Sequence, residues 1–590
     1  MCGIFCSVQE RCHNNPDFQN LAERLRIANA ARGPDAQRSH RISLKTIGDD
    51  FGLDLDLFAS ELRLRGDAPV VQPHEQGGDV FCWNGEIFEG LEVSENENDG
   101  TKLFEAIRSL ENPDAIPTLL GTIEGPYAFV FYHGASQRLY FARDPLGRRS
   151  ILIHKPSESK SYFLLASVSV GEDPNYDMDE LSTESIFCLD LKRLVQSNFV
   201  CSMFYIGTGQ ISRTVAEPTK VNSELLSNYP PPILSLDFGC LSEEVSNAVD
   251  QLIFQLDRSV MLRVRNIPIV SDQNGQARVA VLFSGGIDST VLAFLAHRHI
   301  PVDEPIDLLN VAFENPRKIN VQVNGNVAAL PKRAKKQRLR GLAAGNGVLG
   351  SDQSSYMVPD RVTGLTEVEE LRRLCPDRTW NFVEVNVPYE DSQAARSSVE
   401  AIMFPSCTNM DLSLAMALYF ASKAEGRIRT TGVYHPYISP ARVLLNGLGS
   451  DELLGGYGRH RTAFTHRSWQ GLVEELQLEL DHIPTRNLGR DDRIISSHGK
   501  ETRHPFLSLA VVSFLGQLPV HCKLDPRLEV GIGDKTLLRL AARKVGLVEA
   551  SERKKRAMQF GSHSARMEGG DAEKKGHFTI QGALSSNADR

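Results

Sequence analysis

The sequence lacks the features that mark membrane, secreted and nucleic-acid-binding proteins. None of its apolar runs is long enough to span a bilayer, and its N-terminus has neither the basic flank nor the long apolar stretch of a signal peptide. Its 10 cysteines form no CxxC pair and show no metal-ligand spacing, which favours reduced thiols in the cytoplasm or nucleus; we predict the cytoplasm. The formal net charge is −9, which argues against nucleic acid as the main partner.

What the sequence does contain is enough chain for more than one hydrophobic core. It has 590 residues, of which 41% are hydrophobic and 24% charged, as in ordinary globular proteins. Over roughly the first 200 residues, short β-like runs such as YAFVFYH (127–133) alternate with turn residues, which is typical of a largely antiparallel sheet. ARVAVLFSGGIDSTVLAFLAHRH (277–299) instead predicts a buried strand, a glycine-rich turn and a helix, the opening unit of a parallel α/β sheet.

We therefore predict an α/β protein of several domains. A polar and then proline-rich stretch indicates a linker. KRAKKQRLR (332–340) and the glycine-rich segment after it predict a solvated, disordered insertion, with a nuclear-import signal or a site for an acidic partner as alternatives. The predicted parts are a first domain at 1–205, a linker at 206–244, a second domain at 245–565 with the insertion at 317–355, and a disordered tail at 566–590.

The first candidate site begins at the second residue of the chain. If Met1 is removed, Cys2 carries both a thiol and a free α-amine with an ordinary pKa of about 7.7–8.0, and one residue supplies nucleophile and base. The alternative is an incidental, small buried residue. Four further segments follow: ARGPDA (31–36), WNGEIF (83–88), NDGT (98–101) and RDPLGRRS (143–150). Each alone is weak evidence for a site, but their order behind a cysteine at position 2 is strong evidence.

Together these segments resemble the class II, N-terminal-nucleophile (Ntn) glutamine amidotransferase domains. The resemblance implies an Ntn-hydrolase fold of αββα layers in which Cys2 attacks the side-chain carbonyl of glutamine. It implies that Asn84 and the N–H of Gly85 form the oxyanion hole. It also implies that Glu86 and Asp99 bind the α-ammonium group of glutamine.

An arginine should hold the α-carboxylate of glutamine through a bidentate contact. The segment ELRLRGD offers Arg63 and Arg65, and we assign Arg65, with Arg63 as the alternative. For Arg32 and Asp35 of the ARGPDA loop, an ion pair that stabilises the loop is as good an interpretation as a functional role.

The second candidate site is SGGIDS (284–289), which lies between a predicted strand and a predicted helix. Such a turn can direct N–H groups and hydroxyls toward an anion at the start of a helix. It is not the GxxxxGK[ST] nucleotide loop, because no Lys follows, but it matches the PP-loop of ATP pyrophosphatases; a chance glycine-rich turn is the alternative. Asp288 is a candidate magnesium ligand. The candidate pyrophosphate-binding residues are Ser284, Gly285, Gly286 and Ser289.

Two later segments complete this second set. VLLNGLGSDELLGGYGRHR (443–461) contains Asp451, a second carboxylate for magnesium, and GDKTLLRLAARKVG (533–546) opens a helix with Lys535. With SGGIDS, they resemble the synthetase domain of glutamine-dependent asparagine synthetases, over about residues 245–565. The resemblance implies a doubly wound α/β domain of the adenine nucleotide α-hydrolase type. It places Leu282 and Gly447 near the nucleotide and Lys535 on the pyrophosphate.

The resemblance implies a glutamine-hydrolysing asparagine synthetase that uses ATP and Mg²⁺. Ammonia from glutamine would reach an ATP-activated carboxylate, converting aspartate to asparagine with release of AMP and pyrophosphate. Two positions depart from the family loop SGEGSDE, because this chain has Asn446 where the loop has serine and Leu448 where it has glutamate. Two alternatives therefore stay open: a different carboxylate substrate, or a degenerate synthetase with a regulatory or scaffold role. The expected partners are small molecules, with neither nucleic acid nor membrane, and the oligomeric state is open.

Overall fold

The computed structural model describes residues 2–11, 16–45, 52–196, 208–212, 220–232, 241–269, 275–314 and 355–567. Its elements define a mixed α/β protein. The predicted insertion, apart from Ser355, and the predicted tail beyond Met567 lie outside the described residues. The stretch predicted as a linker is not wholly one, because Thr208–Ser212 form strand β12, which pairs in register with β11 (Ser185–Asp190). Its part at 220–232 has neither helix nor strand.

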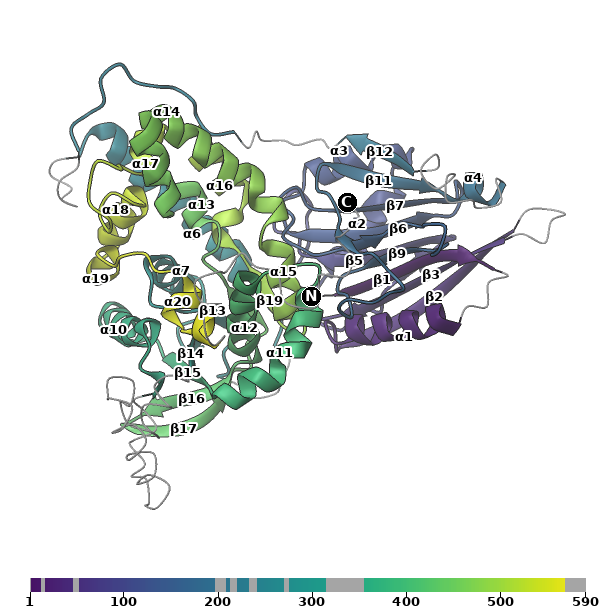
Figure 1. The fold of residues 1–590 in the computed structure, drawn as a ribbon, viewed down its shortest axis with the longest axis horizontal. Helices are drawn as coiled ribbons and strands as arrows, with labels where there is room; N and C mark the ends of the chain where they lie inside the picture. The colour runs from purple at the N-terminus through teal and green to yellow at the C-terminus, as the bar shows by residue number, and fades with distance from the viewer. Residues whose placement is uncertain are drawn as a thin grey trace, which may run out of the picture.

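The N-terminal half contains two six-stranded sheets whose strand pairs are all antiparallel (Figure 1). The first sheet has the order β10-β8-β9-β1-β3-β2, and the second has the order β12-β11-β7-β6-β5-β4. Strands not yet given are β1 (Gly3–Glu10), β2 (Ala36–Lys45), β3 (Gly52–Glu61), β4 (His74–Gln76), β5 (Asp79–Gly85), β6 (Tyr127–His133), β7 (Arg138–Arg143), β8 (Leu152–His154), β9 (Phe163–Ala166) and β10 (Asp179–Glu180). The helices are α1 (Pro16–Ala30), α2 (Asp99–Arg108), α3 (Ile116–Gly121) and α4 (Leu191–Gln196).

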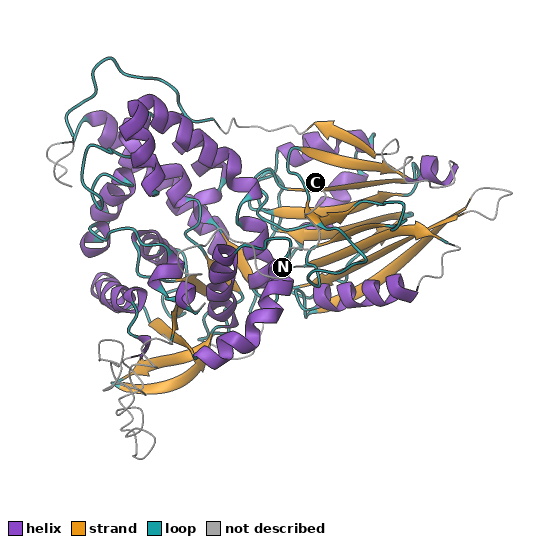
Figure 2. Cartoon of the chain, viewed as in Figure 1, coloured by secondary structure: helices purple, strands orange, loops and turns teal. Residues whose placement is uncertain are grey.

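Alternation of side chains along the strands explains how these sheets stack. In β1, Ile4 and Cys6 enter the core between the two sheets, whereas Phe5 points to the other face and packs with α1. In β5, Cys82 joins the core between the sheets, whereas Phe81 packs with α2 and α3. The layers therefore run helix, sheet, sheet, helix, as Figure 2 shows.

The C-terminal half is built on a seven-stranded sheet of order β17-β16-β15-β14-β13-β18-β19. The neighbouring strands β15, β14, β13, β18 and β19 are all parallel. At one edge, β16 pairs antiparallel with both β15 and β17. The strands are β13 (Val279–Leu282), β14 (Ile306–Phe313), β15 (Trp380–Val387), β16 (Glu425–Thr430), β17 (Val433–Ile438), β18 (Val443–Leu445) and β19 (Glu501–Arg503).

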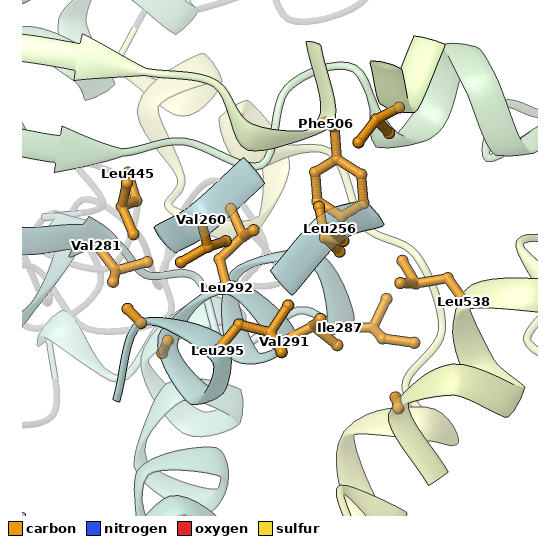
Figure 3. Close-up of a cluster of buried hydrophobic side chains, with 14 of the residues drawn as sticks. Leu256, Val260, Val281, Ile287, Val291, Leu292, Leu295, Leu445, Phe506 and Leu538 are labelled. Carbon is orange, nitrogen blue, oxygen red and sulfur yellow. The ribbon is translucent and has the colours of Figure 1, made fainter. Parts of the chain in front are cut away.

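Helices cover both faces of this sheet, because neighbouring residues of its strands enter different cores. Val281 packs with Val260 and Leu292 of two helices (Figure 3), whereas Ala280 joins the core on the other face. The helices are α6 (Glu243–Val264), α7 (Ile287–His297), α10 (Pro359–Leu374), α11 (Tyr389–Met403), α12 (Asn409–Lys423), α13 (Ser450–Leu454), α14 (Gly458–His482), α15 (Leu488–Ser496), α16 (Leu509–Gln517), α17 (Val520–Lys523), α18 (Thr536–Lys544), α19 (Val548–Ser551) and α20 (Met558–Gly561). Within the described ranges, no helix has the length and apolar character of a membrane span.

The strand order reverses at β13. The chain continues from β13 to β14 and β15 on one side, and later returns to place β18 and β19 on the other side. In open α/β sheets, ligands bind outside the carboxyl ends of the strands at such a reversal. The SGGIDS turn follows β13 and the NGLG turn follows β18, so both lie at this point.

Candidate active sites

Cys2 lies buried at the start of β1, directly beside the end of β5. Its backbone N–H donates a hydrogen bond to Oδ1 of Asn84 at 3.1 Å. The next residue, Gly3, leaves no room for a side chain, since a Cβ there would lie 1.9 Å from the carbonyl oxygen of Asn29. Gly85 is under the same restriction, since a Cβ would lie 2.6 Å from the Trp83 ring. Gly3 therefore allows β1 to pack closely against the end of α1, and Gly85 allows the end of β5 to pack against the start of β6.

The amide of Asn84 has one satisfied and one unsatisfied end. Its Oδ1 accepts from Cys2, but its Nδ2 is buried and has no hydrogen-bond partner among the described residues. A buried amide donor without a partner is costly, typically about 1–3 kcal/mol, and it is ready to bind an oxygen beside the thiol. Gln72, which the sequence analysis did not select, places its Nε2 3.7 Å from Sγ of Cys2 and accepts from the Trp83 N–H through Oε1.

The thiol itself is not activated by its surroundings. Burial raises the pKa of Cys2 to about 12, against the lowering effect of the positive chain terminus. At neutral pH the thiol is therefore protonated, and its attack on a carbonyl requires a base close to Sγ.

The charged residues expected to bind glutamine lie together next to this thiol. Nε of Arg65 contacts Oε2 of Glu86 at 2.8 Å, and Asp99 accepts hydrogen bonds from the N–H groups of Ile87 and Gly100. Burial and the nearby Glu86 raise the pKa of Asp99 to about 7. Arg63 points elsewhere, because its guanidinium donates to the carbonyls of Asp67 and Ile269, so only one of the two candidate arginines reaches Glu86.

The ion pair expected within the loop ARGPDA does not form. Arg32 and Asp35 do not pair with each other but with the C-terminal half: Arg32 with Asp492 at 2.7 Å, and Asp35 with Arg442 at 2.5 Å. Arg32 also donates from Nε to the carbonyl oxygen of Cys2 at 3.2 Å. The loop lies in the contact between the two halves, so each charge finds a partner across it.

A second contact across the halves completes the first site. Nη2 of Arg503, which ends β19 in the C-terminal half, lies 3.1 Å from Oε1 of Glu86. Arg503 was not predictable from the sequence, since the densely charged segment that contains it shows no pairing pattern. Glu86, the carboxylate expected to bind glutamine, therefore contacts one arginine from each half.

The SGGIDS turn connects β13 to α7 as expected. Gly285 has a φ of +74°, and a Cβ there would lie 2.5 Å from the N atom of Gly364 in α10. The hydroxyl of Ser284 accepts from the Gly286 N–H at 3.3 Å, and the hydroxyl of Ser289 donates to the Gly286 carbonyl at 3.0 Å. These bonds hold the turn open toward the cavity at the start of α7.

Two carboxylates and two lysines face this turn. Nζ of Lys535 lies 2.7 Å from an oxygen of Asp288 and 2.7 Å from one of Asp451. Nζ of Lys555 contacts the other oxygen of Asp451 at 2.6 Å. Burial alone would raise the pKa of Asp451, but the two lysines lower it to about 2, so this carboxylate is ionised. Lys555 was not selected from the sequence, although the basic run KKR that contains it could have indicated an anion site.

Glycines permit this close packing of charges. A Cβ on Gly447 would lie 2.9 Å from Cβ of Asp288, and one on Gly456 would lie 1.9 Å from Oδ1 of Asp451. Two carboxylates that share one cation at 2.7 Å form an oxygen donor set of the kind that Mg²⁺ prefers beside phosphate oxygens. The donor set therefore fits Mg²⁺.

A cavity of about 800 Å³ opens beside these charges. Of the residues expected at the nucleotide, the cavity is lined by Leu282, Ser284, Asp288, Ser289, Gly447 and Asp451, and Lys555 joins them. Gly285, Gly286 and Lys535 are not among the lining residues. The space is large enough for a nucleotide. Arg490 and Asp491 of α15 form another part of its wall.

Leu448 faces this cavity with an apolar side chain. It packs partly buried against the main core of the C-terminal half, and its N–H donates to Oδ1 of Asn446 at 3.1 Å. Glu452 does not replace the expected glutamate, because its carboxylate accepts hydrogen bonds from the Gly449 N–H and the Tyr457 hydroxyl. Burial raises the pKa of Glu452.

The comparisons with known proteins agree with the resemblance. The profile of the asparagine synthase family matches residues 464–574. Over 96% of its length, the chain is 36% identical to "asparagine synthetase domain-containing protein 1" of Gallus gallus, covering 98% of that protein, and 36% identical to the Homo sapiens protein of that name, covering 96%. It is 30% identical to a Saccharomyces cerevisiae relative over 91% of this chain and 87% of that one. The chain belongs to the family of asparagine synthetase domain-containing proteins, which confirms the family expected from the sequence.

Proposed function

We propose that this chain is a glutamine-dependent amidotransferase, which releases ammonia from glutamine at Cys2 and transfers it to a carboxylate activated by ATP in the cavity. The N-terminal layers would be an Ntn-hydrolase fold and the C-terminal sheet a PP-loop ATP pyrophosphatase fold. The observation that carries the proposal is the Asn84 amide, with Oδ1 on the nitrogen of Cys2 and Nδ2 buried beside the thiol without a partner among the described residues.

The glutaminase reaction follows from these contacts. Once Met1 is removed, the nitrogen bonded to Asn84 is the α-amine of Cys2, and it accepts the thiol proton. Sγ attacks the side-chain carbonyl carbon of glutamine, and the resulting oxyanion receives hydrogen bonds from Asn84 Nδ2 and the Gly85 N–H. The C–N bond then breaks, ammonia leaves with the proton held by the amine, and water hydrolyses the thioester to glutamate.

The charges beside the thiol orient glutamine. Arg65 binds the α-carboxylate, while Glu86 and Asp99 bind the α-ammonium group. Arg65 pairs with Glu86 at 2.8 Å, so an amino acid finds a cation for its carboxylate and an anion for its ammonium group side by side. The neutral side-chain amide is then the end that lies beside Sγ.

At the second site the chain would bind ATP with its pyrophosphate on the SGGIDS turn and Lys535. Asp288 and Asp451 would hold Mg²⁺, which supplies neutralisation of phosphate charge when bound. The acceptor carboxylate attacks the α-phosphate, pyrophosphate leaves, and ammonia then displaces AMP from the acyl-adenylate. Aspartate is the proposed acceptor, with asparagine as product.

Leu448 favours a second candidate. Leucine neither accepts nor donates a proton, and losing an acid–base group typically costs about 10²–10⁴-fold in rate. A weak or absent asparagine synthesis follows, with another carboxylate as substrate or a regulatory role for the chain.

The test measures glutamine hydrolysis, and AMP and pyrophosphate formation with glutamine or ammonia, across candidate amino acids. Cys2→Ala should abolish hydrolysis, and Asn84→Asp should reduce it about 10²–10³-fold, since it keeps the acceptor but loses the donor. Cys6→Ala, which removes a buried thiol from the same strand, is the control and should retain activity. Mass spectrometry should find Met1 absent. Hydrolysis by the Cys2→Ala protein would refute the proposal.

A further inference from the structure

Helix α15 lies between the cavity of the second site and the N-terminal half that carries the first site. Figure 1 shows it at the boundary of the two halves, close to the N-terminus. Two consecutive residues of α15 have different neighbours. Asp491 lines the cavity of the second site, and Asp492 is fully buried against the N-terminal half. Their Cα atoms are about 3.8 Å apart, as in any trans peptide, so a shift of the α15 backbone displaces both residues.

Asp492 is the anchor for residues around the nucleophile. Its Oδ2 accepts from Nη2 of Arg32 at 2.7 Å and from the N–H of Ser150 at 3.2 Å, and its Oδ1 lies 3.5 Å from Arg149. Arg32 in turn donates from Nε to the carbonyl oxygen of Cys2 at 3.2 Å. A continuous path of polar contacts therefore runs from the C-terminal half to the backbone of the nucleophile.

The cavity end of α15 is held equally firmly. Nη2 of Arg490 contacts Oδ1 of Asp491 at 2.7 Å, and Nη1 reaches Asp411 at the start of α12. All three residues line the cavity. A ligand that draws on any of these charges changes the contacts of α15 directly.

We propose that Asp492 and Arg32 are positioning residues for Cys2, and that α15 makes the position of Cys2 depend on what occupies the cavity. This inference rests on the proposed function. Removing the charge of Asp492 leaves Arg32 buried without its counter-ion, which releases the hold on the Cys2 carbonyl. The glutamine-binding residues Arg65 and Asp99 make no contact with Asp492, so the change acts on turnover and not on glutamine affinity.

A matched control lies in the same interface. Arg442 pairs with Asp35, which belongs to the same loop as Arg32, at 2.5 Å. This pair also joins the two halves, but no hydrogen bond connects it to Cys2 or to a cavity residue among the described residues. Arg442→Gln therefore removes a comparable ion pair without touching the proposed path.

The first experiment measures kcat and KM for glutamine, with and without a non-hydrolysable ATP analogue and Mg²⁺. In the wild type, kcat should change at least threefold when the analogue is added. In Asp492→Asn, kcat should fall about tenfold with KM within twofold, and the response to the analogue should vanish. Arg32→Lys, which keeps the charge, should be intermediate, and Arg442→Gln should respond like the wild type.

A second readout does not depend on hydrolysis. The rate of Cys2 alkylation by iodoacetamide, followed on the Cys2 peptide by mass spectrometry, should change with the analogue in the wild type and in Arg442→Gln but not in Asp492→Asn. If no variant hydrolyses glutamine and labelling still follows this pattern, the proposed function fails and this inference stands. Equal responses in Asp492→Asn and Arg442→Gln, or no response in the wild type, would overturn it.

Discussion

At the first site, the cations come from both halves of the molecule, whereas at the second site the cations and anions all come from the C-terminal half. Arg65 and Arg503 contact different oxygens of Glu86, at 2.8 and 3.1 Å. Lys535 and Lys555 instead surround Asp451 from neighbouring segments, next to a cavity of about 800 Å³. The first site thus depends on how the halves are joined, and the second is a self-contained pocket.

The difference has a consequence for ligands. A zwitterion such as an amino acid can pair its carboxylate with Arg65 and its ammonium group with Glu86. Because the zwitterion has no net charge, its binding leaves the net charge of the site unchanged. A polyanion such as a nucleotide needs uncompensated cations, and the second site holds its two lysines on carboxylates that Mg²⁺ can take over. The charge arrangement of each half therefore matches a different class of ligand.

The largest expected effect is on the second site alone. Lys535→Met removes the cation that Asp288 and Asp451 share and leaves Lys555 on Asp451 alone, so affinity for ATP with Mg²⁺ should fall about 10³-fold, or about 4 kcal/mol. Lys544→Met, at the partly exposed end of α18, is the matched control. Calorimetry checks this, and glutamine hydrolysis should stay unchanged in both variants. If Lys535→Met bound ATP with Mg²⁺ as tightly as the wild type, the assignment of Lys535 to a pyrophosphate site would be wrong.

A gain-of-function substitution tests the position of Leu448, where the related loop has glutamate. Leu448→Glu should raise asparagine formation about 10²-fold, because it supplies a proton-accepting group where the related loop has one. Partial burial of the new carboxylate should cost about 1–3 kcal/mol of stability. Leu448→Gln, with the same shape and no charge, should show no gain. Robust glutamine-dependent asparagine production by the wild type would show that the glutamate is not needed.

The local elements were predictable from the sequence because their signals are local. YAFVFYH (127–133) coincides with β6, and the strand, turn and helix at 277–299 appear as β13, the SGGIDS turn and α7. Alternation along a strand and a glycine pair between an apolar run and a helix are visible within about ten residues. The proximity of Cys2 and Asn84, which are 82 residues apart, was predictable only through the family resemblance.

Pairings across the halves could not be predicted. Arg32 lies 460 residues from Asp492, and Asp35 lies 407 residues from Arg442, and no sequence period or spacing connects charges over such distances. Arg32 and Asp35 lie three positions apart, which favoured a local pair, but the packing of the halves made a distant partner available to each. Strand β12 was missed for a related reason: its polar, glycine-containing sequence TGQIS becomes a strand only beside β11.

A smaller effect separates the two arginines near the first site. Arg65→Gln should raise KM for glutamine about 30-fold, as expected when a hydrogen bond between charged groups is lost. Arg63→Gln should change KM less than threefold, because that side chain contacts only backbone carbonyls of Asp67 and Ile269. Steady-state kinetics decides between them. A larger effect at Arg63 would reverse the assignment and place the glutamine carboxylate outside the buried pair.

The smallest expected effect is a pH dependence that belongs to the first site and not to the second. Burial and Glu86 raise the pKa of Asp99 from 3.8 to about 7, so below pH 7 this carboxyl is protonated and loses its attraction for the ammonium group of glutamine. KM for glutamine should therefore rise about tenfold for each pH unit below 7. Folding stability should change in the opposite sense: Asp99 ionises in the unfolded chain first, so its contribution is lost as pH rises from about 4 to 7. Asp99→Asn should flatten both slopes. Glu61, whose pKa burial also raises to about 7, is present in both proteins, so the difference between them isolates Asp99. An unchanged KM profile in Asp99→Asn would remove Asp99 from the glutamine site and leave Glu86 as its anion.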